Sequence, residues 1–188
     1  MTRSHSRRHY LRVLGAVGTA GVSGCAQLRG VQRTLASPGE KQWVFESDTD
    51  ETLFPTVADG TVYAGSPVGT LFAVASGSKQ WEFETDGPIT TAPAVGEGTV
   101  FVGDTDGTLY AVDAETGEEQ WTFSTAGSVR SSPVTNRGTV YLGTDKLYAI
   151  DATSGTEQWV FSGETAISSS PALWEEKAVY AGTSDGTL

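Results

Sequence analysis

One tryptophan pattern recurs through most of this chain at a nearly constant interval. Four of the five tryptophans are separated by 38, 40 and 38 residues, and each follows a glutamine and precedes a phenylalanine by two positions. A proline lies twelve residues after each of them. They are Trp43, Trp81, Trp121 and Trp159. A period of about 40 residues is the signature of a repeat array, whose units bury their apolar faces against their neighbours.

Within each unit the pattern of apolar residues has a period of two, as in a strand. Trp-x-Phe places both rings on one face of a strand. Gly-Thr-Val-Tyr at 60–63 and Leu-Phe-Ala-Val at 71–74 mark two further strands, and the segment around each proline marks another. Differences in unit length fall in the predicted turns, and no helical period follows the leader. Four strands in about 40 residues predict an all-β β-propeller of four-stranded antiparallel blades.

The connection before the recurrent tryptophan carries the most specific motif. Residues 111–121 read Ala-Val-Asp-Ala-Glu-Thr-Gly-Glu-Glu-Gln-Trp, and residues 149–159 are close to them. This resembles the tryptophan-docking motif of the pyrroloquinoline-quinone-like (PQQ-like) repeat propellers, Ala-x-Asp-x-x-Thr-Gly-x-x-x-Trp, over about residues 41–188. The first unit departs from the motif, because Ala75 replaces the aspartate and the turn is two residues shorter.

We interpret the tryptophans as structural, with each indole wedged between neighbouring blades. Asp113 and Thr116 are expected to hold the turn that aims Trp121, through side-chain hydrogen bonds to backbone amides. An aromatic platform for a flat ligand is the alternative. The predicted docking set is Trp43, Trp81, Trp121, Trp159, Asp113, Thr116, Gly117, Asp151 and Gly155.

The repeats predict an open arc of about three and a half blades rather than a closed ring. The fourth unit reaches Gly186-Thr187-Leu188, which matches the start of the third strand in the second unit at 107–109. Propellers close with about 4–8 blades, and proteins with PQQ-like repeats use seven or eight. We therefore expect either that these residues belong to a longer protein or that two or more chains complete a ring.

The N-terminal segment reads as an export signal. Residues 1–24 combine basic residues with a short apolar stretch, and the pair Arg7-Arg8 resembles a twin-arginine signal. Small residues then precede Cys25, as in a lipobox, so Cys25 is predicted to be lipidated and to hold the protein on the outer face of the cell membrane. Cleavage nearby, with Cys25 incidental, is the alternative. Residues 25–40 are interpreted as a spacer, and 41–188 as propeller blades.

Composition excludes several classes of function. The chain has 23 acidic and 12 basic residues, a net charge of −11, and four of the basic residues precede residue 25. This balance argues against binding nucleic acid. Both histidines lie in the leader and there is one cysteine, which excludes a Ser-His-Asp triad and a His or multi-Cys zinc site. The acidity resembles that of proteins from extreme halophiles, with a basic partner as the alternative explanation.

Three functions follow from the resemblance. The first is a non-enzymatic protein-interaction module, as in the BamB-like exported lipoproteins, with no catalytic residue, metal or cofactor and with an unidentified protein partner. The second is a PQQ- and calcium-dependent quinoprotein dehydrogenase, and the third is the ligand-binding part of a larger exported system. Asp104-Thr105-Asp106-Gly107 could ligate calcium, but Asp-Gly also forms hairpin turns.

Overall fold

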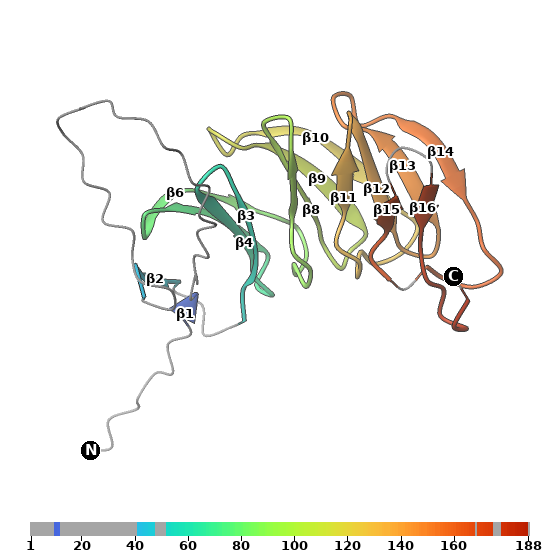
Figure 1. Ribbon diagram of the computed structural model, residues 1–188, viewed down its shortest axis with the longest axis horizontal. Helices are drawn as coiled ribbons and strands as arrows, with labels where there is room; N and C mark the ends of the chain where they lie inside the picture. Colours follow the sequence, from blue (N-terminus) through green and yellow to red (C-terminus); the bar gives the residue numbers. More distant parts are fainter. Residues whose placement is uncertain (1–9, 12–40, 48–51, 168, 175–177, 188) are drawn as a thin grey trace, which may run out of the picture.

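The chain forms a row of small antiparallel sheets that stand side by side in an open arc (Figure 1). The computed structural model describes residues 10–11, 41–47, 52–167, 169–174 and 178–187. These residues form strands and turns without a helix, so the predicted all-β class is confirmed. Nor does the described part contain a helix long and apolar enough to cross a membrane. Arg7, Arg8 and Cys25 lie outside the described residues.

Three of the sheets are complete four-stranded blades, as the repeat predicts. Consecutive strands pair antiparallel, so each blade is a meander in which the third strand lies between the second and the fourth. The first blade contains β3 (Phe54–Ala58), β4 (Thr61–Gly65), β5 (Thr70–Ala75) and β6 (Ser78–Glu84). The second contains β7 (Ala94–Gly96), β8 (Thr99–Gly103), β9 (Thr108–Asp113) and β10 (Glu119–Ser124). The third contains β11 (Val134–Asn136), β12 (Thr139–Gly143), β13 (Leu147–Asp151) and β14 (Glu157–Phe161).

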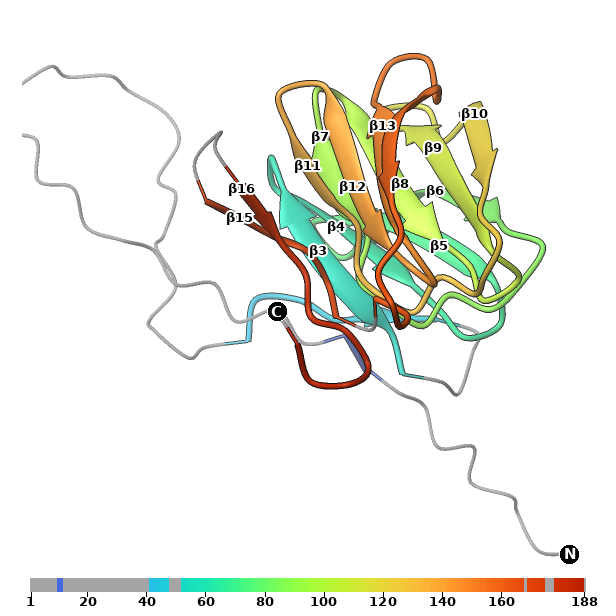
Figure 2. The same ribbon diagram turned by 90° about the vertical axis from the view of Figure 1, so that its right-hand side faces the viewer.

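Two-stranded sheets flank the three blades. β15 (Ala172–Trp174) pairs with β16 (Ala178–Tyr180) in the register of the first two strands of a blade. Seen from that end of the arc, this ribbon lies beside the third blade (Figure 2). At the other end β2 (Phe45–Glu46) pairs with β1 (Tyr10–Leu11), although the sequence places Tyr10 and Leu11 in the leader.

Alternate residues of each strand pack against different neighbouring blades. In β8 the side chains of Val100 and Val102 join the core between the first and second blades, whereas Phe101 joins the core between the second and third. All three are fully buried. The period of two therefore serves two interfaces, and a blade with a neighbour on each side has both faces covered.

The glycine that ends the second strand of each blade has a packing role. At Gly65, Gly103 and Gly143 an added Cβ would overlap the side chain of Ile89, Val129 or Ile167, respectively, which lies in the connection to the next blade. Each of these three apolar side chains is at most 3% exposed. The recurrent glycine thus allows the following segment to cross close to the strand, a close approach that only a residue without a Cβ permits.

The close approach at Gly103 predicts a coupled pair of substitutions. Gly103→Ala should lower the free energy of unfolding by about 2 kcal/mol, because the new methyl group overpacks against Val129. Adding Val129→Ala removes the two methyl groups of Val129 that would lie 2.3 and 3.0 Å from the new methyl group. This relieves part of the overlap, so the double variant should lose less stability than the sum of the single variants. Urea denaturation of all four proteins measures the coupling, and strictly additive losses would contradict the packing role of Gly103.

Candidate interaction site at an open blade edge

The recurrent tryptophans join each blade to the next. Trp81, on β6 of the first blade, donates a hydrogen bond from Nε1 to the backbone oxygen of Ala114 in the second blade, at 3.1 Å. Trp121, on β10, makes the same bond to Ala152 of the third blade at 3.0 Å. Each indole is therefore partly buried between two blades and satisfies its one polar group there.

A glycine in a left-handed conformation receives each of these indoles. Gly117 has φ +77°, and an added Cβ would lie 2.8 Å from the Trp81 ring; at Gly155, with φ +69°, it would lie 2.7 Å from Trp121. Gly77, in the shortened turn of the first blade, faces Trp43 less closely: an added Cβ would lie 3.1 Å from Cβ of Trp43 and 3.5 Å from its ring. The turn predicted to aim Trp121 therefore also receives the tryptophan of the preceding blade.

Aspartate side chains hold two of these docking turns. Asp113 Oδ1 accepts hydrogen bonds from the backbone amides of Glu115 and Thr116 at 3.0 and 2.8 Å, and from the Thr116 hydroxyl at 3.1 Å. Asp151 Oδ1 accepts an equivalent set from Thr153 and Ser154. The amide of Thr116 and then that of Glu115 lower the pKa of Asp113. The amide and then the hydroxyl of Ser154 lower the pKa of Asp151.

The glutamine before each tryptophan also has a structural role, which sequence reasoning noted only as part of the repeat. Gln120 accepts a hydrogen bond from the hydroxyl of Thr99, on the second strand of its blade, at 3.1 Å. Its amide donates to Asp113 Oδ2 at 3.3 Å. Gln158 accepts from Thr139 at 3.2 Å. The glutamine thus joins the fourth strand of a blade to the Gly-Thr pair at the start of the second strand. The recurrence of both motifs in successive units could have indicated this contact.

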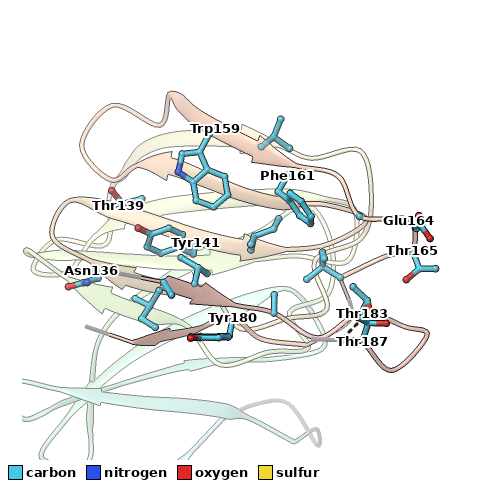
Figure 3. Close-up of a pocket in the computed structure, with 18 of the residues that line it drawn as sticks. Asn136, Thr139, Tyr141, Trp159, Phe161, Glu164, Thr165, Tyr180, Thr183 and Thr187 are labelled. Atoms are coloured by element: carbon cyan, nitrogen blue, oxygen red, sulfur yellow. Dashed lines mark hydrogen bonds between the residues drawn. The ribbon is translucent and has the colours of Figure 1, made fainter. Parts of the chain in front are cut away.

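The tryptophan of the third blade lies in a different environment. Trp159 is 41% exposed and faces a groove of about 1060 Å³ between β14 and the β15–β16 ribbon (Figure 3). Phe161 and Tyr141 line the same side, and Tyr180 lies on the opposite side. We call this surface the β14 groove.

Exposed apolar side chains are concentrated around the β14 groove. Among the described residues, seven large hydrophobic side chains are classed as exposed, and five of them belong to β14, β15 or β16: Trp159, Val160, Phe161, Trp174 and Tyr180. Four of them, Trp159, Val160, Phe161 and Tyr180, line the β14 groove. Exposed apolar side chains gathered in this way mark a site of association. The β14 groove is therefore the candidate functional site.

The candidate calcium sequence does not leave its buried carboxylate free for a cation. Asp104 is fully buried. Its Oδ1 accepts bonds from the amides of Asp106 and Thr108 at 3.1 and 2.8 Å. Its Oδ2 accepts from the Gly87 amide and the Tyr110 hydroxyl at 3.2 and 3.0 Å. Because four donors already surround this carboxylate, and no three His, Cys, Asp or Glu side chains of the described residues cluster as metal ligands, these residues do not fit a calcium site.

Comparison with known proteins identifies both a family and a fold. A family model described as outer membrane protein assembly factor BamB matches residues 29–159 and 68–188. No curated protein matches the chain in sequence.

Three solved structures illustrate the likeness in fold. BamB from Moraxella catarrhalis has a TM-score of 0.69 at 19% identity, over 78% of this chain and 48% of that one. The quinohemoprotein alcohol dehydrogenase ADHIIG from Pseudomonas putida HK5 has a TM-score of 0.69 at 22% identity, over 78% and 30%. The computationally designed protein Ika4 has a TM-score of 0.71 at 16% identity, over 79% and 95%. These likenesses show the propeller fold alone, and the chain spans about half the length of the BamB structure.

The docking glycines allow a matched test of indole docking. Gly117→Ala and Gly98→Ala both place a side chain in a left-handed conformation, at φ +77° and +79°, but nothing lies within 4 Å of the new methyl group at Gly98. Each variant should lose about 1 kcal/mol to backbone strain. Gly117→Ala should lose a further ~2 kcal/mol, because its methyl group meets the Trp81 ring. Equal losses in urea denaturation would show that docking at Gly117 contributes nothing to stability.

The docking aspartates predict a specific acid sensitivity. A carboxyl group whose pKa is lower in the folded protein than in the unfolded chain stabilises the fold fully above the unfolded pKa, near 4. That contribution is lost as pH falls through the folded pKa. The melting temperature should therefore drop between pH 5 and 3, and it should drop less in the double variant Asp113→Asn, Asp151→Asn, which is less stable at pH 7. An equally steep pH dependence in the double variant would contradict this assignment.

Proposed function

The chain belongs to the family of the outer membrane protein assembly factor BamB, and we propose on this premise that it is a non-enzymatic propeller that binds other polypeptides. The β14 groove is the observation that carries the proposal. It gathers exposed aromatic side chains at one blade edge, and Trp and Tyr are among the residues that contribute most to protein–protein binding. A groove beside a strand ribbon also suits a partner that adds strands to the sheet.

The distribution of polar side chains supports binding rather than catalysis. Asp113 and Asp151 hold docking turns, and Asp104 holds the turn before β9 while bonding to the connection that precedes β7. Tyr110 donates to Asp104 and accepts from the Asp86 amide, and burial is the main reason that its pKa rises to about 12. These groups are engaged in holding blades together, and a phenol with so high a pKa is a poor general base at neutral pH.

A quinoprotein dehydrogenase is the second candidate, because the quinohemoprotein alcohol dehydrogenase ADHIIG has a similar fold. That likeness, at 22% identity, concerns the fold. The single cysteine of the chain cannot form a pair of neighbouring cysteines beneath a quinone. We therefore expect no alcohol-dependent dye reduction after incubation with PQQ and calcium, and sustained turnover would reverse the choice between the two functions.

We also propose that the protein is exported and lipid-anchored. The support is the basic and apolar leader with Arg7-Arg8, followed by small residues and Cys25. Diacylation of a cysteine provides two acyl chains, which is enough for stable attachment to a membrane. The propeller would then work at the outer face of the cell membrane, tethered through the spacer of residues 25–40.

Capture from membranes tests this function. A tagged chain isolated from solubilised membranes should retain a polypeptide of different sequence in near-stoichiometric amount. The double variant Arg7→Lys, Arg8→Lys, which should stall export, is the matched control and should not retain it. Cys25→Ser should release the chain from the membrane fraction or block its maturation. Isolation of the wild-type chain without any other polypeptide would contradict the binding function. An unmodified Cys25 in the N-terminal peptide, detected by mass spectrometry, would contradict the lipid anchor.

A further inference from the structure

The fourth-strand phenylalanines of the first two blades each contact an aromatic ring of the following blade. The ring centroids of Phe83 and Tyr110 lie 5.6 Å apart at an interplanar angle of 65°, and those of Phe123 and Tyr148 lie 5.5 Å apart at 68°. Both tyrosines belong to the third strand of the following blade. Phe161 holds the same position in β14, but it is 56% exposed and no ring of another described residue pairs with it.

A single extended segment covers this face at both junctions. Between the first and second blades, Tyr110, Val112 and Ala114 join the shared core from alternate positions of that segment. The backbone oxygen of Ala114 also accepts the indole hydrogen bond of the preceding blade. The corresponding residues between the second and third blades are Tyr148, Ile150 and Ala152. The face therefore takes a strand with an aromatic residue, a branched aliphatic residue two positions later and an alanine two positions after that.

The β14 groove has the features that receive such a segment (Figure 3). Trp159 and Phe161 line it, and within the described residues Trp159 makes no indole hydrogen bond of the kind that Trp81 and Trp121 make. On the other side β16 pairs with β15 alone in the part of the chain that the structure describes, whereas the second strand of each complete blade also pairs with a third strand. The second edge of β16 can therefore exchange backbone hydrogen bonds with an added strand.

We propose that the β14 groove binds an extended segment of a separate polypeptide. The segment adds to β16 as an antiparallel strand, as the third strand adds to the second in the complete blades. Its aromatic side chain packs on Phe161, its aliphatic side chain enters the groove two residues later, and the backbone oxygen of the following alanine accepts the Trp159 indole bond. The groove thus selects the sequence aromatic-x-aliphatic-x-alanine, a preference that rests on the proposed binding function.

Two other occupants fit the groove less well. Its volume of about 1060 Å³ lies above the range of about 300–1,000 Å³ that is typical of small-molecule sites. A second copy of the chain has the selected sequence, within the described residues, only in and directly after β9 and β13. Each of these strands is already paired on both edges in its own blade. A folded second copy would have to give up one of its blades to fill the groove, so a polypeptide of different sequence is the better occupant.

A synthetic peptide with the sequence of residues 106–114 is the probe, because it contains Tyr110, Val112 and Ala114 at their natural spacing. Titration of the labelled peptide with the purified 188-residue chain should show saturable binding by fluorescence anisotropy. Alanine in place of the peptide's tyrosine should weaken binding about tenfold, because the contact with Phe161 and its buried area are lost. Phe161→Ala in the protein should weaken binding by a similar factor. Trp174→Ala is the matched control and should bind normally, because Trp174 is also 56% exposed but does not line the groove.

A double-mutant cycle distinguishes this contact from general destabilisation. When Phe161→Ala is combined with the alanine peptide, the loss of affinity should be smaller than the product of the two single losses, because both changes remove the same contact. Near-UV circular dichroism should stay native in the variant. A peptide that does not bind, or losses that multiply, would overturn the proposal. A chain that forms dimers of twice 19.7 kDa, which excess peptide does not dissociate, would also overturn it. Capture of a membrane polypeptide alongside any of these results would leave the proposed function standing.

Discussion

The structure depends on one repeated contact, an indole from one blade seated on a left-handed glycine of the next. The contact joins the fourth strand of a blade to the turn before the fourth strand of its neighbour, so it fixes both the distance and the order of the blades. A side chain on that glycine would displace the ring, and a residue other than tryptophan would lose either the ring area or the bond to the backbone oxygen. The array is therefore held by pairwise contacts between neighbours.

Nearest-neighbour docking has a direct consequence at the edge of the third blade. Trp121 is covered because the next blade supplies a docking turn, whereas Trp159 occupies the same position in its own blade and faces the β14 groove. Blades with equivalent sequences therefore differ in the side chains that they expose, because a docking turn covers this face in one blade and not in the next. The binding that we propose at the groove would need no further motif, because a face that packs against a blade elsewhere in the repeat is already apolar and aromatic.

The polar residues of the repeat also serve assembly. Asp113 and Asp151 hold the turns that receive the indoles, and Gln120 and Gln158 join fourth strands to second strands. Asp104 joins the turn before β9 to the connection between the first and second blades. The hydrogen-bonding groups of these side chains are satisfied by neighbouring residues of the chain. The carboxylates and amides of the repeat therefore have a structural role in the described blades.

The blade could be predicted from the amino-acid sequence, because a period of two, turn residues and a repeat of about 40 residues are local signals that do not depend on tertiary context. The sequence also indicated the docking residues, although not the direction of docking. Only the tertiary structure showed that the turn before Trp121 receives Trp81, that Gly103 makes room for Val129, and that Trp159 differs from its three counterparts. Each of these facts depends on which blade lies next to which. Repeats with similar local sequences do not reveal whether a neighbouring blade covers them.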